Sequence, residues 1–183
     1  QFEFLKPSVI FNDLRQSLEK QSIDKSTSQA SSDNKWATDL QRFFNLFNDR
    51  KLALDVFTVV EDGRLDARVK IEYAGIRFAY SRVQMDSLES RPEIQSLPAR
   101  EAMVEFLVRF GLQQSTEFMV PNKYVEEAGK IAQIAKQILT PSATVEAVAE
   151  ATLRIYAIIS LIPNDQVSDK EWEKIELSKN FMQ

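Results

Sequence analysis

The sequence predicts an α+β fold that is predominantly α-helical, a bundle of about six helices with a small three-strand antiparallel β-meander. Over most of the chain, apolar residues recur every three or four positions, which is the period of a helix with one buried face. Between residues 65 and 73 they recur every second position, as in a half-buried strand. With 183 residues, 44% of them apolar, the chain can bury a core without a disulfide or a metal.

The first 35 residues are predicted to form an N-terminal arm, a first helix and a polar linker. Residues 9–20 carry an apolar stripe at helical spacing, and Pro7 and Ser8 precede them as start signals. Residues 21–35 are rich in Ser, Gln and Asp, which is typical of a surface loop or linker. We therefore expect one globular domain over residues 36–183.

The meander is predicted from three short segments in succession. Residues 65–73 alternate apolar and charged side chains, and residues 52–60 are rich in β-branched and apolar side chains. A Glu-Asp-Gly sequence at residues 61–63 is a plausible turn between them, and a third strand is expected over residues 76–83. A sheet this small needs helices on its apolar face to be stable.

The helices of the globular domain are predicted on both sides of the meander. The first runs from Trp36 to near Asn48. A C-terminal helical bundle spans residues 98–179, with helices over 98–110, 121–139 and 140–162 and a short last helix that begins at a Ser168–Glu171 capping box. The helix over residues 140–162 has almost no polar face in its second half, so we expect it at the centre of the core.

The composition excludes several kinds of chemistry. The chain has no Cys and no His, so it has no disulfides, no thiolate chemistry, no zinc ribbons and no Ser-His or Cys-His triads. Its four glycines are scattered, so no Gly-rich phosphate-binding loop can form. The net charge of −4 gives no global field that attracts a polyanion. We expect no enzymatic activity and no cofactor or metal, and we identify no small-molecule substrate.

A carboxylate site is the enzymatic alternative that the sequence leaves open. Glu61, Asp62 and Asp66 surround the first predicted turn and offer the oxygen ligands that Mg²⁺ prefers. Acidic residues are also common in turns for backbone reasons, so a solvated acidic turn is the other interpretation. A magnesium-dependent carboxylate enzyme is therefore the third hypothesis, and no residue is assigned a catalytic role.

Basic residues gather on the predicted meander. Arg68 and Lys70 fall on one face of the expected strand, where they could follow a phosphate backbone. The same face carries Asp66 and Glu72, so it could equally be the solvated side of a half-buried sheet. The candidate residues for RNA contact are Arg64, Arg68, Lys70, Arg77 and Arg82.

Aromatic residues ahead of the meander are the candidates for contact with a partner. An apolar arm on a polar linker is suited to docking on a neighbouring subunit, and aromatic side chains commonly anchor interfaces. The arm and the helix that begins at Trp36 could instead pack on the core of their own chain. The candidate interface residues are Phe2, Phe4, Leu5, Phe11, Trp36, Phe43, Phe44 and Phe47.

Together these patterns predict a non-catalytic, self-associating structural or assembly protein, with a second copy as its main partner and RNA as a further one. A mostly helical subunit with a small β element, an apolar arm and a basic patch has the general layout of coat or nucleocapsid subunits. The alternative is an adaptor that binds another protein through the aromatic helix face. The sequence shows no signal-peptide pattern and no membrane-spanning apolar segment, so we expect a soluble protein. Its location is not assigned, and the cytoplasm and a virion are the options left open.

Overall fold

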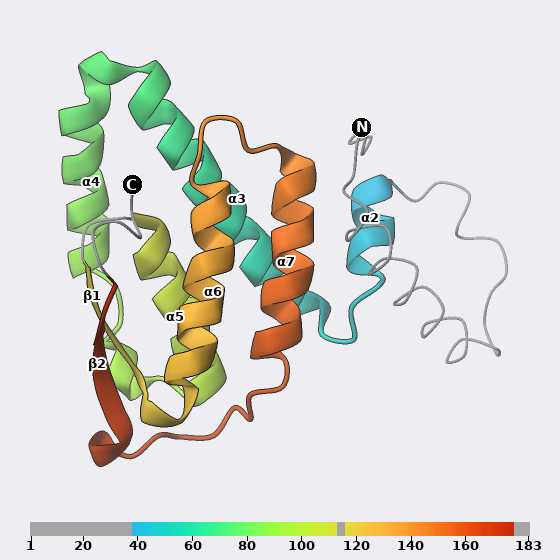
Figure 1. Cartoon of the computed structure of the whole chain (residues 1–183), viewed down its shortest axis with the longest axis vertical. Coiled ribbons are helices and arrows are strands. Elements are labelled where there is room, and N and C mark those ends of the chain that lie inside the picture. The colour runs from blue at the N-terminus through green and yellow to red at the C-terminus, as the bar shows by residue number, and fades with distance from the viewer. Residues whose placement is uncertain (1–37, 113–115, 178–183) are drawn as a thin grey trace, which may run out of the picture.

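The computed structural model describes residues 38–112 and 116–177 (Figure 1). Within these residues the chain is mostly helical, with six α-helices and one antiparallel sheet of two strands. The helices are α2 (Asp39–Phe44), α3 (Arg50–Glu72), α4 (Arg77–Glu89), α5 (Ala99–Leu112), α6 (Val125–Ile138) and α7 (Val145–Ile159). The strands are β1 (Glu117–Pro121) and β2 (Trp172–Glu176).

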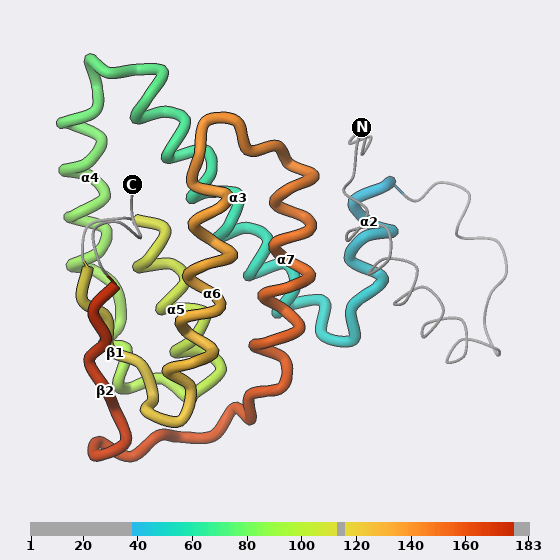
Figure 2. Tube along the Cα trace, in the orientation of Figure 1, coloured from blue at the N-terminus to red at the C-terminus, as the bar shows by residue number. Residues whose placement is uncertain are grey.

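The main core lies among α3, α5, α6 and α7. α3 packs against α5 and α7, and α6 packs against α7; Figure 2 shows α6 and α7 side by side. The largest side chains that are fully buried in this core include Met103, Phe106, Phe110, Ile131, Ile155 and Ile159. They come from the helices whose apolar stripes were the clearest in the sequence, so burial of one helix face explains this part of the fold.

The three long helices predicted for the C-terminal bundle are confirmed with shifted ends. α5 continues to Leu112, two residues past the predicted end at Phe110. α6 begins at Val125, after one turn of 3₁₀-helix (Asn122–Tyr124). α7 begins at Val145 because the Thr144 side chain caps it, accepting a hydrogen bond from the backbone N–H of Ala147 at 3.4 Å.

The predicted β-meander is wrong, because residues 52–83 form most of α3, a turn and the first half of α4. Leu52, Val56 and Val60 are four positions apart and lie buried on one face of α3. That face packs on α5 and α7, and its burial overrides the weaker strand preference of the β-branched residues around it. The segments 52–60, 65–73 and 76–83 are therefore helical or lie in the turn between the two helices.

Gly63 marks a helix crossing and not the predicted turn. It lies inside α3, where a Cβ atom would stand 3.0 Å from Leu139 Cδ2 and 3.7 Å from the Cα of Gly111 in α5. Because neither glycine has a side chain, α3 and α5 can approach closely at this point.

The sheet joins two distant parts of the C-terminal half. β1 and β2 pair antiparallel, with Glu117 opposite Glu176 and Pro121 opposite Trp172. The Ser168–Glu171 capping box is confirmed, but it opens one turn of 3₁₀-helix and β2 follows directly. The predicted short last helix is therefore wrong, because this segment pairs with β1 instead.

α2 is the part of the second predicted helix that the structure describes. It begins after Thr38, which forms a capping box with Gln41. Trp36 lies outside the described residues, as do the arm, the helix predicted over 9–20 and the linker over 21–35. α2 is attached to α3 and α7 through a second, smaller core cluster around Phe43 and Phe47.

Candidate interaction surface

The most exposed apolar side chains gather on the helical hairpin made by α3 and α4. Among the large hydrophobic residues that are exposed in the described part of the chain, all but Leu54 and Leu161 lie between residues 65 and 85. We call them the hairpin surface: Leu65, Ile71, Tyr73, Ile76, Phe78, Val83 and Met85. In Figure 1 the tip of this hairpin extends beyond the ends of α6 and α7.

α4 has its polarity reversed relative to a typical surface helix. Its one buried residue is Gln84, only 5% exposed, whereas Phe78 is 84% exposed. Val83 and Met85, which flank Gln84 in the sequence and point in different directions around the helix, are also exposed. A surface helix normally turns its apolar stripe to the core, so this arrangement leaves the apolar side chains of α4 available for a partner.

Polar contacts hold the inner face of α4 against α3. The Asp66 carboxylate accepts a hydrogen bond from the Tyr80 hydroxyl and another from Gln84 Nε2 at 2.5 Å. The bond to Asp66 is the main reason that the pKa of Tyr80 is raised to about 12. Arg77 Nε donates to the backbone carbonyl of Lys70 at 3.0 Å and closes the turn.

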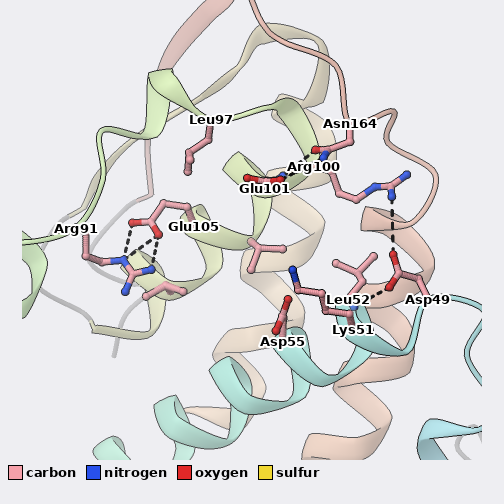
Figure 3. A pocket seen from close by; sticks show the side chains of 12 residues that line it. Asp49, Lys51, Leu52, Asp55, Arg91, Leu97, Arg100, Glu101, Glu105 and Asn164 are labelled. Atoms are coloured by element: carbon pink, nitrogen blue, oxygen red, sulfur yellow. Dashed lines mark hydrogen bonds and ion pairs between the residues drawn. The ribbon is translucent and has the colours of Figure 1, made fainter.

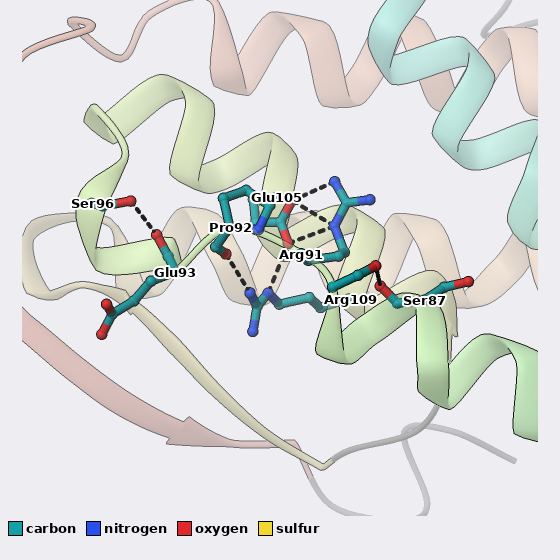
Figure 4. A network of polar contacts seen from close by, with 8 residues as sticks. Ser87, Arg91, Pro92, Glu93, Ser96, Glu105 and Arg109 are labelled. Carbon is teal, nitrogen blue, oxygen red and sulfur yellow. Dashed lines mark hydrogen bonds and ion pairs between the residues drawn. The ribbon is translucent and has the colours of Figure 1, made fainter.

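A buried carboxylate fixes the other end of α4 to α5 (Figure 4). Glu105 is only 4% exposed and accepts from Arg91 Nε at 2.7 Å and from Arg109 Nε at 2.8 Å. Arg109 also donates to the carbonyl of Pro92 at 2.8 Å. The hydrogen bond with Glu105 raises the pKa of Arg91 above its ordinary value. Two cations thus compensate one buried charge, and the hairpin is held at both ends by polar contacts.

The basic residues predicted to bind RNA do not form one face. Arg64 is buried at 9% exposure, where it donates to Glu61 from Nη2 at 2.6 Å and to the carbonyl of Ala143 at 3.3 Å. The hydrogen bond with Glu61 raises the pKa of Arg64, so its charge is engaged inside the protein.

The other four basic residues differ in their surroundings. Arg68 forms an ion pair with Glu72 at 2.6 Å. Lys70 is half-buried, and this burial lowers the pKa of its ammonium. Arg77 binds the Lys70 carbonyl, and Arg82 faces solvent with no ion pair among the described residues. Because residues 68 and 70 lie on a helix, they point about 200° apart, so the predicted alignment on one strand face is wrong.

The aromatic residues predicted to form an interface are placed differently from one another. Phe43 and Phe47 are buried, and the Phe47 ring packs edge-on against Tyr156 at a centroid distance of 4.7 Å. Phe44 is half-buried against Phe57. The structure therefore uses two of these rings in its own core. The remaining candidates, Phe2, Phe4, Leu5, Phe11 and Trp36, lie outside the described residues.

The acidic residues considered for Mg²⁺ lie in α3 and not around a turn. Glu61 is paired with Arg64, and Asp66 is bound by Tyr80 and Gln84. Burial, followed by the nearby charges of Asp66 and Glu61, raises the pKa of Asp62. In residues 38–112 and 116–177, no three acidic side chains come together in a way that could hold a metal ion.

Two hollows in the described surface offer less to a ligand. A cleft of about 250 Å³ lies between the start of α3 and α5 (Figure 3), where Asp49 and Arg100 face each other at 4.0 Å. It mixes both signs of charge and is smaller than most ligand pockets. A groove of about 400 Å³ between α6 and α7 has an apolar floor with Ile134 and Ile158 and a basic rim with Lys130 and Arg154.

Comparison with known proteins adds no functional assignment. No family model matches the sequence, and no curated protein or solved structure matches it. In the part of the chain that the structure describes, none of the helices combines the length and apolar character needed to cross a membrane. The function must therefore be inferred from the surface itself.

Sequence reasoning missed the exposed apolar side chains of the hairpin surface. The sequence predicts a β-meander for this segment, with the apolar face of the sheet covered by helices. One feature of the sequence could have indicated this surface. If residues 65–85 are helical, their apolar side chains are spread around the helix and do not form a single buried face.

Proposed function

We propose that the protein is a non-catalytic structural or assembly protein that self-associates through the hairpin surface. The observation that carries the proposal is the exposure of seven large apolar side chains on one helical hairpin. Clustered apolar side chains in water are uncommon on monomeric proteins and mark interaction sites. Phe78, at 84% exposure, would contribute roughly 1.5–3 kcal/mol if a partner buried it fully, and the other six side chains, which are already about half buried, would each contribute less.

A second copy of the chain is the partner that we propose. Most oligomers of soluble proteins are built from identical subunits, and two helical hairpins can pack together as a four-helix arrangement. Subunits of coat or nucleocapsid type are the class that fits this proposal. An adaptor that uses the same surface for a different protein is the alternative, and it differs by remaining monomeric on its own.

RNA contact is not part of the proposed mechanism of association. Arg64 and Arg68 are engaged by Glu61 and Glu72, which leaves Arg77 and Arg82 as the candidates that are exposed without an ion pair in the described residues. Purified protein that carries nucleic acid, detected by its absorbance ratio and removed by high salt, would bring RNA back into the proposal.

The proposed function is tested by light scattering of the full chain across a dilution series. We expect the wild-type mass to rise with concentration and Phe78→Asp to remain monomeric, because burial of an unpaired charge in an apolar contact is costly. Leu161→Asp is the matched control, since Leu161 is 82% exposed but lies at the end of α7, away from the hairpin. A wild-type protein that is monomeric at all concentrations would contradict the proposal and favour the adaptor.

A further inference from the structure

The outward face of α4 combines apolar and charged residues in a regular order. Phe78, Arg82, Met85 and Glu89 are spaced by four, three and four positions, so they form one row along the helix. Asp86 lies beside this row, one turn beyond Arg82. All of these residues are exposed, so the face is open along the length of α4.

The charges on this face change sign along the helix. Arg82 lies near the middle, and Asp86 and Glu89 lie toward the C-terminal end. None of the three has an ion pair within the described residues, although Arg82 and Asp86 are one turn apart. A surface with this order is complementary to a copy of itself that runs in the opposite direction.

We propose that two copies of the protein pair through α4 in antiparallel orientation about a two-fold axis, with Arg82 of each copy opposite Asp86 of the other. The proposal rests on the proposed function, self-association through the hairpin surface, and specifies its geometry. An axis level with residue 84 aligns the two Arg–Asp pairs. Met85 lies in the same row as Arg82 and one residue from the axis, so the two Met85 side chains meet between the charged pairs.

The ends of the contact fit the same register. The small side chain of Ala79 lies level with Glu89 of the second copy, which permits close approach of the two helices. Phe78 then reaches the end of the second copy's α4, and Ile76 extends the apolar contact beyond it. A parallel arrangement is disfavoured, because it would place each Arg82 beside its equivalent and leave the acidic residues facing each other.

The α6–α7 groove is a poorer receptor for the hairpin. Its lining includes Lys130 and Arg154 but no carboxylate that could pair with Arg82 of the hairpin. The α4–α4 arrangement pairs opposite charges without any further element of the chain.

The test uses charge reversal in the full chain, with mass measured by light scattering and sedimentation. Arg82→Glu makes both facing pairs acidic, and Asp86→Arg makes both basic, so each variant alone should dimerise about tenfold more weakly or worse. An equimolar mixture of the two variants restores both pairs, because each copy then faces the opposite charge. We expect the mixture to form a heterodimer with nearly the wild-type dissociation constant.

Controls separate the geometry from the proposed function. Lys51→Glu reverses an exposed charge at the far end of α3 and should leave dimerisation unchanged. Circular dichroism of each variant verifies that it remains folded. If Phe78→Asp dissociates the wild-type assembly but the mixed variants do not recombine, the antiparallel register is wrong while self-association stands. If the wild-type chain never associates, both proposals are wrong.

Discussion

α4 and α7 are helices of similar length that use their apolar side chains in opposite ways. In α7, Val148, Ile155 and Ile159 are fully buried among α3, α5 and α6. In α4, Phe78, Val83 and Met85 are exposed, and polar groups such as Gln84 face the protein. α7 is therefore held in the fold by apolar burial, whereas α4 is held mainly by hydrogen bonds and ion pairs.

This difference predicts a difference in local stability. Burial of a large apolar side chain contributes roughly 1.5–3 kcal/mol, whereas a typical hydrogen bond contributes about 0.5–1.5 kcal/mol net. α4 buries few large apolar side chains, so the hairpin should open more readily than the core when it has no partner. A partner that covers the outer face of α4 would raise the local stability of the hairpin toward that of the core.

The largest expected effect comes from comparing a phenylalanine of each region. Phe106→Ala removes a fully buried ring of α5 and should lower the free energy of unfolding by about 3–5 kcal/mol. Phe78→Ala should change it by no more than about 0.5 kcal/mol in dilute protein, because the ring is already in water. Urea unfolding of both variants measures the difference. Equal destabilisation would show that the outer face of α4 is covered within its own chain.

Sequence alone predicted the core helices because each of them buries one face. Ile131, Ala135 and Ile138 recur at helical spacing in α6 and are buried. The opposite side of the same helix is polar, so the pattern has a single interpretation. For α6, the spacing of the apolar residues is enough to predict a helix and its buried face.

The hairpin could not be predicted in the same way. Buried Val56 and Val60 do form a helical stripe in α3, but exposed Leu54, Leu65 and Ile71 conceal it by filling the other faces. In residues 65–73 the extra apolar residues fall at alternate positions, which resembles a strand. Conflicts between local pattern and fold are expected where a surface serves a partner, so the wrong prediction coincides with the candidate site.

The two strands were missed for a different reason. β1 and β2 are each five residues long, and every bond between them joins segments that are far apart in the chain. The sequence of either strand alone has too few alternating positions to indicate a strand, and its partner is not its neighbour. Their pairing depends on the packing of α5 beside β1, which spacing does not reveal.

The second prediction concerns the anchor of α4 on α5. Glu105→Ala leaves Arg91 and Arg109 without the carboxylate between them and should lower the free energy of unfolding by about 3 kcal/mol. Glu101→Ala, in the same helix but exposed, should cost less than about 1 kcal/mol. Thermal unfolding measures both. Hydrogen exchange should also show faster opening of α4 in Glu105→Ala, and unchanged exchange there would mean that the anchor is elsewhere.

The third prediction concerns the contact between Tyr80 and Asp66. Tyr80→Phe removes one donor from the Asp66 carboxylate and should lower the free energy of unfolding by about 1–2 kcal/mol at neutral pH. The pKa of Tyr80 is raised from 10.0 to about 12, so its contribution is fully present below pH 10 and is lost as the pH rises toward 12. Ultraviolet titration of the phenolate measures this pKa. A phenol that titrates near its ordinary pKa of 10.0 would contradict the contact.

The smallest effect is expected at Asp62, where α3 leaves the core and enters the hairpin. Burial and the charges of Asp66 and Glu61 raise the pKa of Asp62, so the folded protein disfavours its ionised form. Asp62→Asn should therefore stabilise the protein at neutral pH, by less than about 1 kcal/mol because solvent screens the exposed carboxylate. The gain should disappear as the pH falls below the ordinary pKa of 3.8, where Asp62 is neutral in both states. Asp55→Asn, which removes a charge one turn from Lys51, should give no gain, and equal stabilisation by both variants would refute local repulsion at Asp62.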